Sequence, residues 1–274
     1  MDPKLWEARN ERRYRMSLNH RYHHSLLLAL WEPVPVAVGA VGYMVKPTGS
    51  FVTLFNAVNP SESNDPRVKS IPSIAGYGKV PIGSHRHATR NAALRGFDAV
   101  VGFLSSGKRD DPSANPSLSR RASFSLRSGH KVAYMYTEST EYRYMRELQA
   151  PKAWFQANVG RIIETFGEDH NVHREDLLLI IGILQAPNYA LFVSHSHPCG
   201  SVHFHTFNPR PGKPWGTFTT DTKTLNEHGG PLYHEASPTP HQCAYKVSIN
   251  EDQAKTLLLA RLRFPPDALE PTSL

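Results

Sequence analysis

The apolar run LLLIIGIL, residues 177–184, restricts the possible folds more than any other stretch of this chain. A helix that crosses a membrane needs about 18 or more apolar residues, so eight are far too few. Charged residues precede the run and a proline follows it closely. A short apolar run between such boundaries is typical of a strand that is covered on both faces. We therefore expect a buried strand inside a sheet.

Other segments carry strand and turn signals. VPVAVGAVGYMVKPTGSFVTLFNAV, residues 34–58, predicts a β-hairpin whose turn is KPTGS. HKVAYMYTESTEYRYM, residues 130–145, has alternating positions and predicts one long strand. TLLLARLRF, residues 256–264, predicts a final strand.

Two segments have helical signals. Residues 1–14 begin with Asp2 and Pro3, a typical helix start, and are basic and weakly amphipathic. Pro151 opens a second helix with a long apolar stripe, which Gly167 is expected to end. The stripe consists of Trp154, Phe155, Val159, Ile162, Ile163 and Phe166. These elements predict an α+β fold: a twisted, mostly antiparallel sheet with a short N-terminal basic helix and one clear amphipathic helix.

The charge is unevenly distributed. The net charge is +7, but residues 67–131 hold twelve Lys and Arg against three acids, and the rest sums to −2. Such segregation favours an anionic partner, either nucleic acid or an acidic membrane surface. No zinc-finger, RRM or helix-turn-helix pattern is present, so we do not expect nucleic acid. A solvated basic flank is the alternative interpretation.

The expected compartment is reducing. Cys199 and Cys243 are too few for a disulfide framework. The N-terminal residues MDPKLWEARNERRYRMSLNH lack the apolar segment of a secretory signal. We therefore expect a cytoplasmic protein.

Four histidines lie close together in LFVSHSHPCGSVHFHTF, residues 191–207: His195, His197, His203 and His205. Strand alternation puts each pair on one face, so a hairpin could bring four imidazoles together as zinc ligands. The hairpin supplies no carboxylate base, there is no H-E-x-x-H, and Cys199 lies in the turn. We expect a hairpin with a polar Ser/His face and no required metal or cofactor. A pH-responsive surface is the third interpretation.

Motifs for other chemistry are scarce. The chain has no Walker A sequence and no G-x-S-x-G, so no enzyme class is indicated. RRAS, residues 120–123, places two arginines ahead of Ser123 and suits a basophilic kinase.

The order of elements resembles the gasdermin pore-forming domain. The resemblance rests on MDPKLWEARNERR, on VGAVGYMVKPTGSFVTLFNAV, on DLLLIIGILQ and on KTLLLARLRF, which together span most of the chain. Only about ten residues follow the last expected strand, so compact fungal gasdermin-like proteins are the more similar type. We accordingly expect one gasdermin-like domain at residues 1–264 and a short tail at residues 265–274.

The resemblance implies a function. It implies a protein of regulated cell death that binds acidic phospholipids, moves from the cytoplasm to a membrane and oligomerises into a β-barrel pore, under control of a protease that removes the tail. The lipid-binding residues would be Arg9, Arg12, Arg13, Arg86, Arg90 and Arg95. The membrane hairpins would use Tyr134, Tyr136, Phe192 and Phe204. The alternatives are a metal-dependent hydrolase that uses the histidines of residues 195–205, and a non-catalytic binding or adaptor domain.

Overall fold

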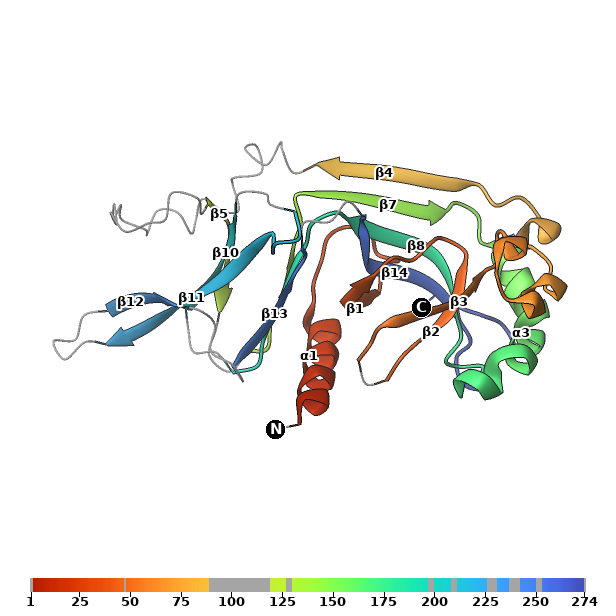
Figure 1. Ribbon diagram of the computed structural model, residues 1–274, viewed down its shortest axis with the longest axis horizontal. Helices are drawn as coiled ribbons and strands as arrows, with labels where there is room; N and C mark the ends of the chain where they lie inside the picture. Colours follow the sequence, from red (N-terminus) through yellow and green to blue (C-terminus); the bar gives the residue numbers. More distant parts are fainter. Residues whose placement is uncertain are drawn as a thin grey trace. The chain divides into compact units, whose positions relative to one another are not determined.

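The computed structural model describes residues 2–46, 48–88, 119–126, 130–196, 200–207, 211–225, 231–236, 242–249 and 253–273. The described strands pair antiparallel and helices accompany them, which confirms the predicted α+β class (Figure 1). The chain divides into two compact units. Unit 1 consists of Met1–His85, Glu141–Ala186 and Gln253–Leu274, and unit 2 of Arg86–Thr140 and Pro187–Asp252.

The largest sheet is built around the predicted buried strand. Its strands follow the order β1 (Leu28–Val34), β14 (Lys255–Arg263), β8 (Leu178–Ala186), β2 (Ala40–Met44) and β3 (Phe51–Asn56), while β7 (Ser139–Met145) also pairs with β8, and β4 (Ile82–Ala88) with β7. Along its other edge β8 meets two partners, β2 near Leu179 and β7 near Leu184. The expected central strand and the expected final strand are both confirmed.

The predicted hairpin exists but starts later than expected. Strands β2 and β3 pair antiparallel, and the turn between them includes Lys46 and Thr48 of the predicted KPTGS turn. The first strand begins at Ala40 because Val36 is held elsewhere, with its N–H donating to Thr256 Oγ1 at 3.2 Å. Between Val36 and Ala40 the chain turns at Gly39, whose φ of 87° favours glycine.

Helix α3 (Gln149–His170) confirms the amphipathic helix and buries its predicted stripe except for Ile163, which is half-buried. Phe166 stacks on Phe55 with ring centres 6.0 Å apart, and Phe155 contacts Phe264 at 5.0 Å. The expectation that Gly167 ends the helix is wrong. The helix continues to His170, and Asn171 ends it with a left-handed φ of 49°.

Helix α1 (Pro3–Ser17) begins where the sequence predicted. The Asp2 side chain caps it by accepting from the Lys4 N–H at 2.9 Å. It ends at Ser17, three residues beyond the expected end. Within the described residues, no helix has both the length and the apolar character that crossing a bilayer requires.

Unit 2 contains two sheets that share an aromatic core. One sheet has the order β12 (Pro231–Ala236), β11 (Gly216–Leu225), β10 (Gly200–Thr206), β5 (Ser119–Leu126), and the other the order β13 (Cys243–Val247), β9 (Ala190–Ser194), β6 (Ala133–Tyr136). Rings from the two sheets meet between them: Phe192 lies 5.2 Å from Phe218, and Tyr136 lies 5.4 Å from Phe204. The core therefore belongs to a β-sandwich.

The single long strand expected at residues 130–145 is wrong. It is two strands, and they join different sheets: β6 pairs with β9, whereas β7 pairs with β8. The buried positions change phase at the break, from Ala133 and Thr137 to Thr140 and Tyr142. A strand that keeps its buried face through such a slip must bend or stop.

The histidine hairpin expected at residues 191–207 is also wrong. Strand β9 pairs with β6 and β13, and β10 pairs with β5 and β11, so the two strands lie in different sheets. Phe192 of β9 and Phe204 of β10 are both fully buried in the aromatic core. Because the two strands lie in different sheets, their apolar side chains can pack against one another in one core. A hairpin would instead place the two strands side by side in a single sheet.

Candidate functional site

Helix α1 of unit 1 turns a polar face toward the protein. Its buried side includes Asn10 and Glu11, which are 1% and 7% exposed, and Tyr14, which is fully buried. Trp31 of β1 donates its indole N–H to Glu7 Oε1 at 3.0 Å, and the Tyr14 and Trp31 rings lie 5.1 Å apart. Hydrogen bonds and ring contacts, rather than an apolar stripe, therefore position this helix.

The turn between β2 and β3 fixes α1 from another side. A side chain at Gly49 would meet Glu11 Cγ at 2.3 Å, so only glycine allows this approach, and its φ of 71° also favours glycine. Glu11 Oε1 in turn accepts from Arg15 Nε at 2.8 Å. The turn sequence predicted for the hairpin thus also holds the helix.

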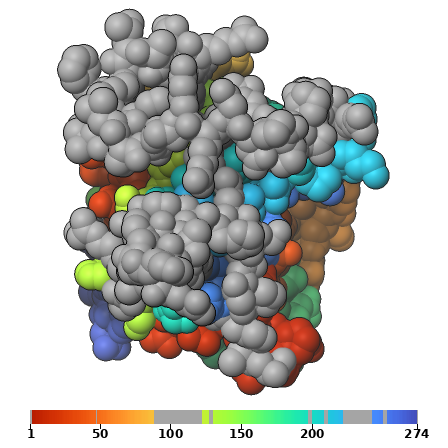
Figure 2. Space-filling model, turned by 90° about the vertical axis from the view of Figure 1, so that its left-hand side faces the viewer, coloured from red at the N-terminus to blue at the C-terminus, as the bar shows by residue number. Residues whose placement is uncertain are grey.

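The outer face of α1 combines cations with apolar side chains. Leu5 and Met16 are 65% and 73% exposed, and Arg9 and Arg12 are exposed between them. The spacing i, i+4, i+7, i+11 puts the four on one face. The red N-terminal segment that contains α1 reaches the surface in Figure 2. Exposed apolar groups flanking two guanidinium groups are typical of a helix that lies in a membrane interface.

A half-buried cation with no partner among the described residues lies near this helix. Arg261 of β14 has no ion pair or hydrogen bond to another described residue. Its pKa is lowered to about 10, first because the guanidinium group is buried and then because Arg263 and Arg15 repel it. We call Arg15, Arg261 and Arg263 the arginine cluster.

The arginine cluster can bind an anion. Burying a charge is costly unless it is paired, and like charges side by side add to that cost. A phosphate or carboxylate group between these guanidinium groups would supply the missing partner through charge-assisted, bidentate hydrogen bonds. Arg261 and Arg263 were not predicted from the sequence, although two arginines at alternate positions of an otherwise apolar strand are a readable signal.

The other predicted lipid-binding residues are placed as follows. Arg9 lies over the Trp6 ring at 5.5 Å. Arg86 is exposed on β4 and is assigned to unit 2. Arg90 and Arg95 lie outside the described residues. The structure therefore brings Arg9, Arg12 and Arg13 together on α1.

The predicted membrane-hairpin residues lie in the core of unit 2. Phe192 and Phe204 are fully buried, and Tyr134 and Tyr136 are half-buried. Tyr134 stacks on Phe124 at 4.4 Å. The four residues are thus part of one aromatic layer.

The predicted wet histidine face is wrong where the structure describes it. His195, His203 and His205 are 6%, 5% and 8% exposed, and His197 lies outside the described residues together with Cys199. His203 Nδ1 lies 2.8 Å from Ser123 Oγ, and its Nε2 lies 2.6 Å from Asp221 Oδ2. In the described part of the chain, no three His, Cys, Asp or Glu side chains are arranged to hold a metal ion.

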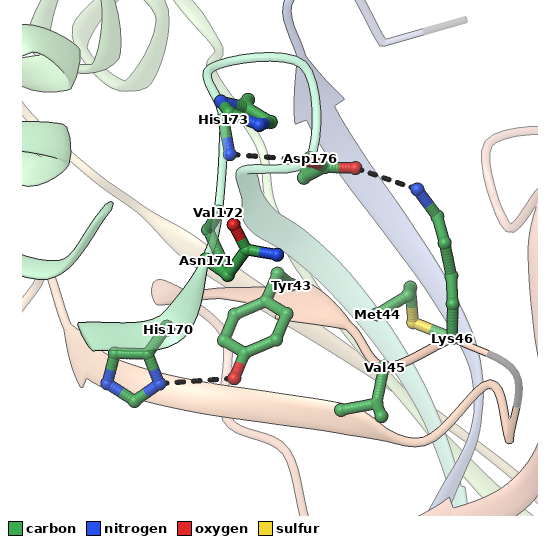
Figure 3. Close-up of a pocket in the computed structure, with 9 residues that line it drawn as sticks. All are labelled: Tyr43, Met44, Val45, Lys46, His170, Asn171, Val172, His173 and Asp176. Atoms are coloured by element: carbon green, nitrogen blue, oxygen red, sulfur yellow. Dashed lines mark hydrogen bonds and ion pairs between the residues drawn. The ribbon is translucent and has the colours of Figure 1, made fainter. Parts of the chain in front are cut away.

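A cavity of about 390 Å³ lies in unit 1 between the end of β2 and the end of α3 (Figure 3). Its polar groups pair with one another: Lys46 Nζ lies 3.1 Å from Asp176 Oδ1, and Tyr43 Oη lies 3.1 Å from His170 Nδ1. Burial acts to raise the pKa of Asp176, but the hydrogen bonds from Lys46 and the His173 N–H outweigh it and lower the value. These charges do not require a ligand, so we favour the arginine cluster.

Comparisons with known proteins give no independent guide. No protein-family model matches the chain, and no curated protein matches it significantly. Function is therefore inferred from the residues, their geometry and the sequence resemblance.

Proposed function

We propose that this chain is a membrane-permeabilising protein of gasdermin type, which binds acidic phospholipids through α1 and oligomerises into a β-barrel pore. The observation that carries the first step is Arg261, a half-buried cation that lies near the basic helix α1 and has no partner among the described residues. The sequence resemblance supports the later steps.

A phospholipid headgroup suits this surface better than a free anion. The outer face of α1 exposes Leu5 and Met16 next to Arg9 and Arg12, so apolar and cationic groups reach the same plane. Each Lys or Arg near an anionic membrane contributes about 1 kcal/mol. An acidic lipid bilayer offers phosphate groups and an apolar layer together, whereas a free anion offers only the charge.

Pore formation would require unit 2 to rearrange. Tyr134, Tyr136, Phe192 and Phe204, the proposed membrane-hairpin residues, contribute to its aromatic core. A bilayer would have to replace that core as the apolar environment, while strand-to-strand pairing keeps the backbone hydrogen-bonded. The proposal therefore includes the opening of the sandwich on the membrane.

Control by the tail is the last element of the proposal. Thr272 exchanges two backbone hydrogen bonds with Arg263, at 2.8 and 3.0 Å. Arg174 lies over the Phe264 ring at 4.1 Å and donates to the Leu269 carbonyl at 3.3 Å. Cleavage by a protease after Phe264 would remove these bonds from the end of β14, next to the arginine cluster.

Liposomes test the proposal. We expect the chain to sediment with phosphatidylserine-containing vesicles and to release an enclosed dye, and not with vesicles of phosphatidylcholine alone. The double variant Arg9→Glu with Arg12→Glu should abolish both effects, because it replaces two lipid-facing cations by anions. Both residues are exposed, so their replacement leaves the core intact. The matched control is Lys69→Glu with Lys79→Glu, which changes the net charge equally at two exposed cations elsewhere in unit 1.

The outcomes are distinct. Equal loss in both double variants would indicate only a general charge effect and contradict a site at α1. Reversal of Arg86, Arg90 and Arg95 tests the second predicted set in the same assay. Binding without dye release, with or without removal of residues 265–274, would leave a peripheral lipid-binding protein and overturn pore formation.

A further inference from the structure

Ser123 is a chemically distinctive position in unit 2. It is exposed on β5, and β5 pairs with β10 and with no other described strand, so it forms an edge of its sheet. Its hydroxyl group lies 2.8 Å from His203 Nδ1, and His203 Nε2 lies 2.6 Å from Asp221 Oδ2. An accessible hydroxyl group therefore begins a hydrogen-bonded chain that ends at a carboxylate.

The residues before Ser123 point to a reaction of that hydroxyl group. The sequence RRAS places Arg120 and Arg121 three and two residues ahead of it. Protein kinases choose substrates partly by charge pattern, and basophilic kinases recognise arginines at these positions. An edge strand presents an extended backbone with one free side, which is the form in which a peptide segment is most readily engaged.

We propose that Ser123 is a phosphorylation site for a basophilic serine/threonine kinase. The γ-phosphoryl group of ATP moves to Ser123 Oγ: a bond forms between phosphorus and Oγ, and the bond to the bridging oxygen breaks. ADP leaves, and the hydroxyl proton passes to the carboxylate base of the kinase. This inference does not depend on the proposed membrane activity.

The structure also indicates what the phosphate would do. In the unmodified chain, the Ser123 hydroxyl can donate to His203 Nδ1 while Nε2–H donates to Asp221, so a neutral imidazole satisfies both contacts. A phosphate group at neutral pH is mostly a dianion, since its second pKa is about 6, and can only accept. Where both contacts are kept, both ring nitrogens of His203 donate, and that arrangement is the imidazolium form between two anions.

A neighbouring serine provides the internal control. Ser125 is also exposed on β5, but Ala122 and Ser123 occupy the positions three and two residues ahead of it. A kinase that reads the basic pair should discriminate between these serines, although both lie on the same edge strand.

The test uses the folded full chain, ATP, magnesium and the catalytic subunit of cAMP-dependent protein kinase. We expect one phosphate per chain, assigned to Ser123 by tandem mass spectrometry, absent in Ser123→Ala and retained in Ser125→Ala. Arg120→Ala with Arg121→Ala should slow incorporation at least tenfold. The site is refuted if a synthetic peptide of residues 117–129 is phosphorylated while the folded chain is not, or if the phosphate lies on another residue.

The coupling to His203 has its own readout. Nitrogen-15 NMR of the ring should show two protonated nitrogens after phosphorylation, and no change when Ser123→Ala is treated with kinase and ATP. Phosphate on Ser123 with an unchanged His203 spectrum would overturn the coupling. His203→Gln keeps a polar side chain and should still be phosphorylated at Ser123, because the kinase recognises the arginines and not His203. Loss of phosphorylation in this variant would show that His203 is needed for the modification itself.

Discussion

Replacing Arg261 by methionine should stabilise this protein and weaken its binding of anions. The substitution removes a half-buried cation that has no partner among the described residues and keeps a flexible side chain of similar volume. Replacing poorly paired buried charges by apolar groups of similar volume is often stabilising. The opposite directions of the two effects are what an anion site predicts.

The magnitude follows from the pKa of Arg261. Its value falls from an ordinary 12.5 to about 10. A tenfold change in an equilibrium constant is about 1.4 kcal/mol, so the charged form costs about 3 kcal/mol in the folded state. For a cation with a lowered pKa, this cost is fully present below pH 10 and disappears as the pH rises from about 10 to 12.5. It therefore acts in full at pH 7.

Thermal unfolding at pH 7 gives the measurement. We expect Arg261→Met to gain about 2 kcal/mol, since some polar contact with water is lost with the charge. That gain raises the midpoint by roughly 4–8 °C in a chain of this size. Arg143→Met is the control, because Arg143 is exposed on β7 and its replacement should change stability by less than about 0.5 kcal/mol.

Inorganic phosphate shows whether Arg261→Met is stabilised because an unpaired charge is removed from an anion site or because methionine packs better. It should raise the midpoint of the unaltered chain and of Arg143→Met, but much less that of Arg261→Met, because ligand binding to the folded state stabilises it. An Arg261→Met midpoint below that of the control, or equal phosphate effects in all three proteins, would refute the arginine cluster as an anion site.

Three further predictions concern the core and the histidines. Ile162→Ala should lower the free energy of unfolding by about 2–5 kcal/mol because this side chain is fully buried on α3, whereas Glu164→Ala on its exposed face should change it by less than about 0.5 kcal/mol; equal urea midpoints would contradict the buried stripe. His203→Ala should cost about 1–3 kcal/mol, since Ser123 and Asp221 lose their partner, and elemental analysis of protein purified without a histidine tag should find no stoichiometric zinc. One zinc per chain, lost in that variant, would support the hydrolase alternative instead. Burial raises the pKa of Cys243 to about 12, so in a Cys199→Ser background iodoacetamide at pH 8 should label the denatured chain and not the folded one; equal rates would place the thiol at the surface.

The elements that could be predicted from sequence are those whose signal is local. The run at residues 177–184 lies mostly in β8, Leu178–Ala186. The strand was predictable because the apolar run is short, with charged residues before it and a proline after it. Helix α3 repeats its apolar positions over several turns, so most of its buried side was predictable, although Ile163 is half-buried and the buried Asn158 was not predicted. Its end was not, because Gly167 and Asn171 are both residues that terminate helices.

Strand partners could not be predicted in this way. The apolar strand that contains Phe192 and the alternating strand that contains Phe204 fit a hairpin or two opposed sheets equally well, and only the identity of the neighbouring strands decides between them. The histidines followed the same ambiguity. His203 alternates with apolar residues and was expected to face water, but Ser123, 80 residues earlier in the chain, lies beside it on β5.

Helix α1 is only weakly amphipathic in sequence, yet in the structure it has a defined inward face and a defined outward face. Its inward face combines the buried Tyr14 ring with polar groups, since Glu7 accepts from Trp31 and Glu11 lies against Gly49, while Leu5 and Met16 are exposed. Departure of the helix would expose the Tyr14 and Trp31 rings, and burial of Leu5 and Met16 in an apolar environment would offset part of that cost. Transfer of α1 to a lipid surface would therefore gain burial for Leu5 and Met16. The same transfer would supply anionic partners for Arg9 and Arg12.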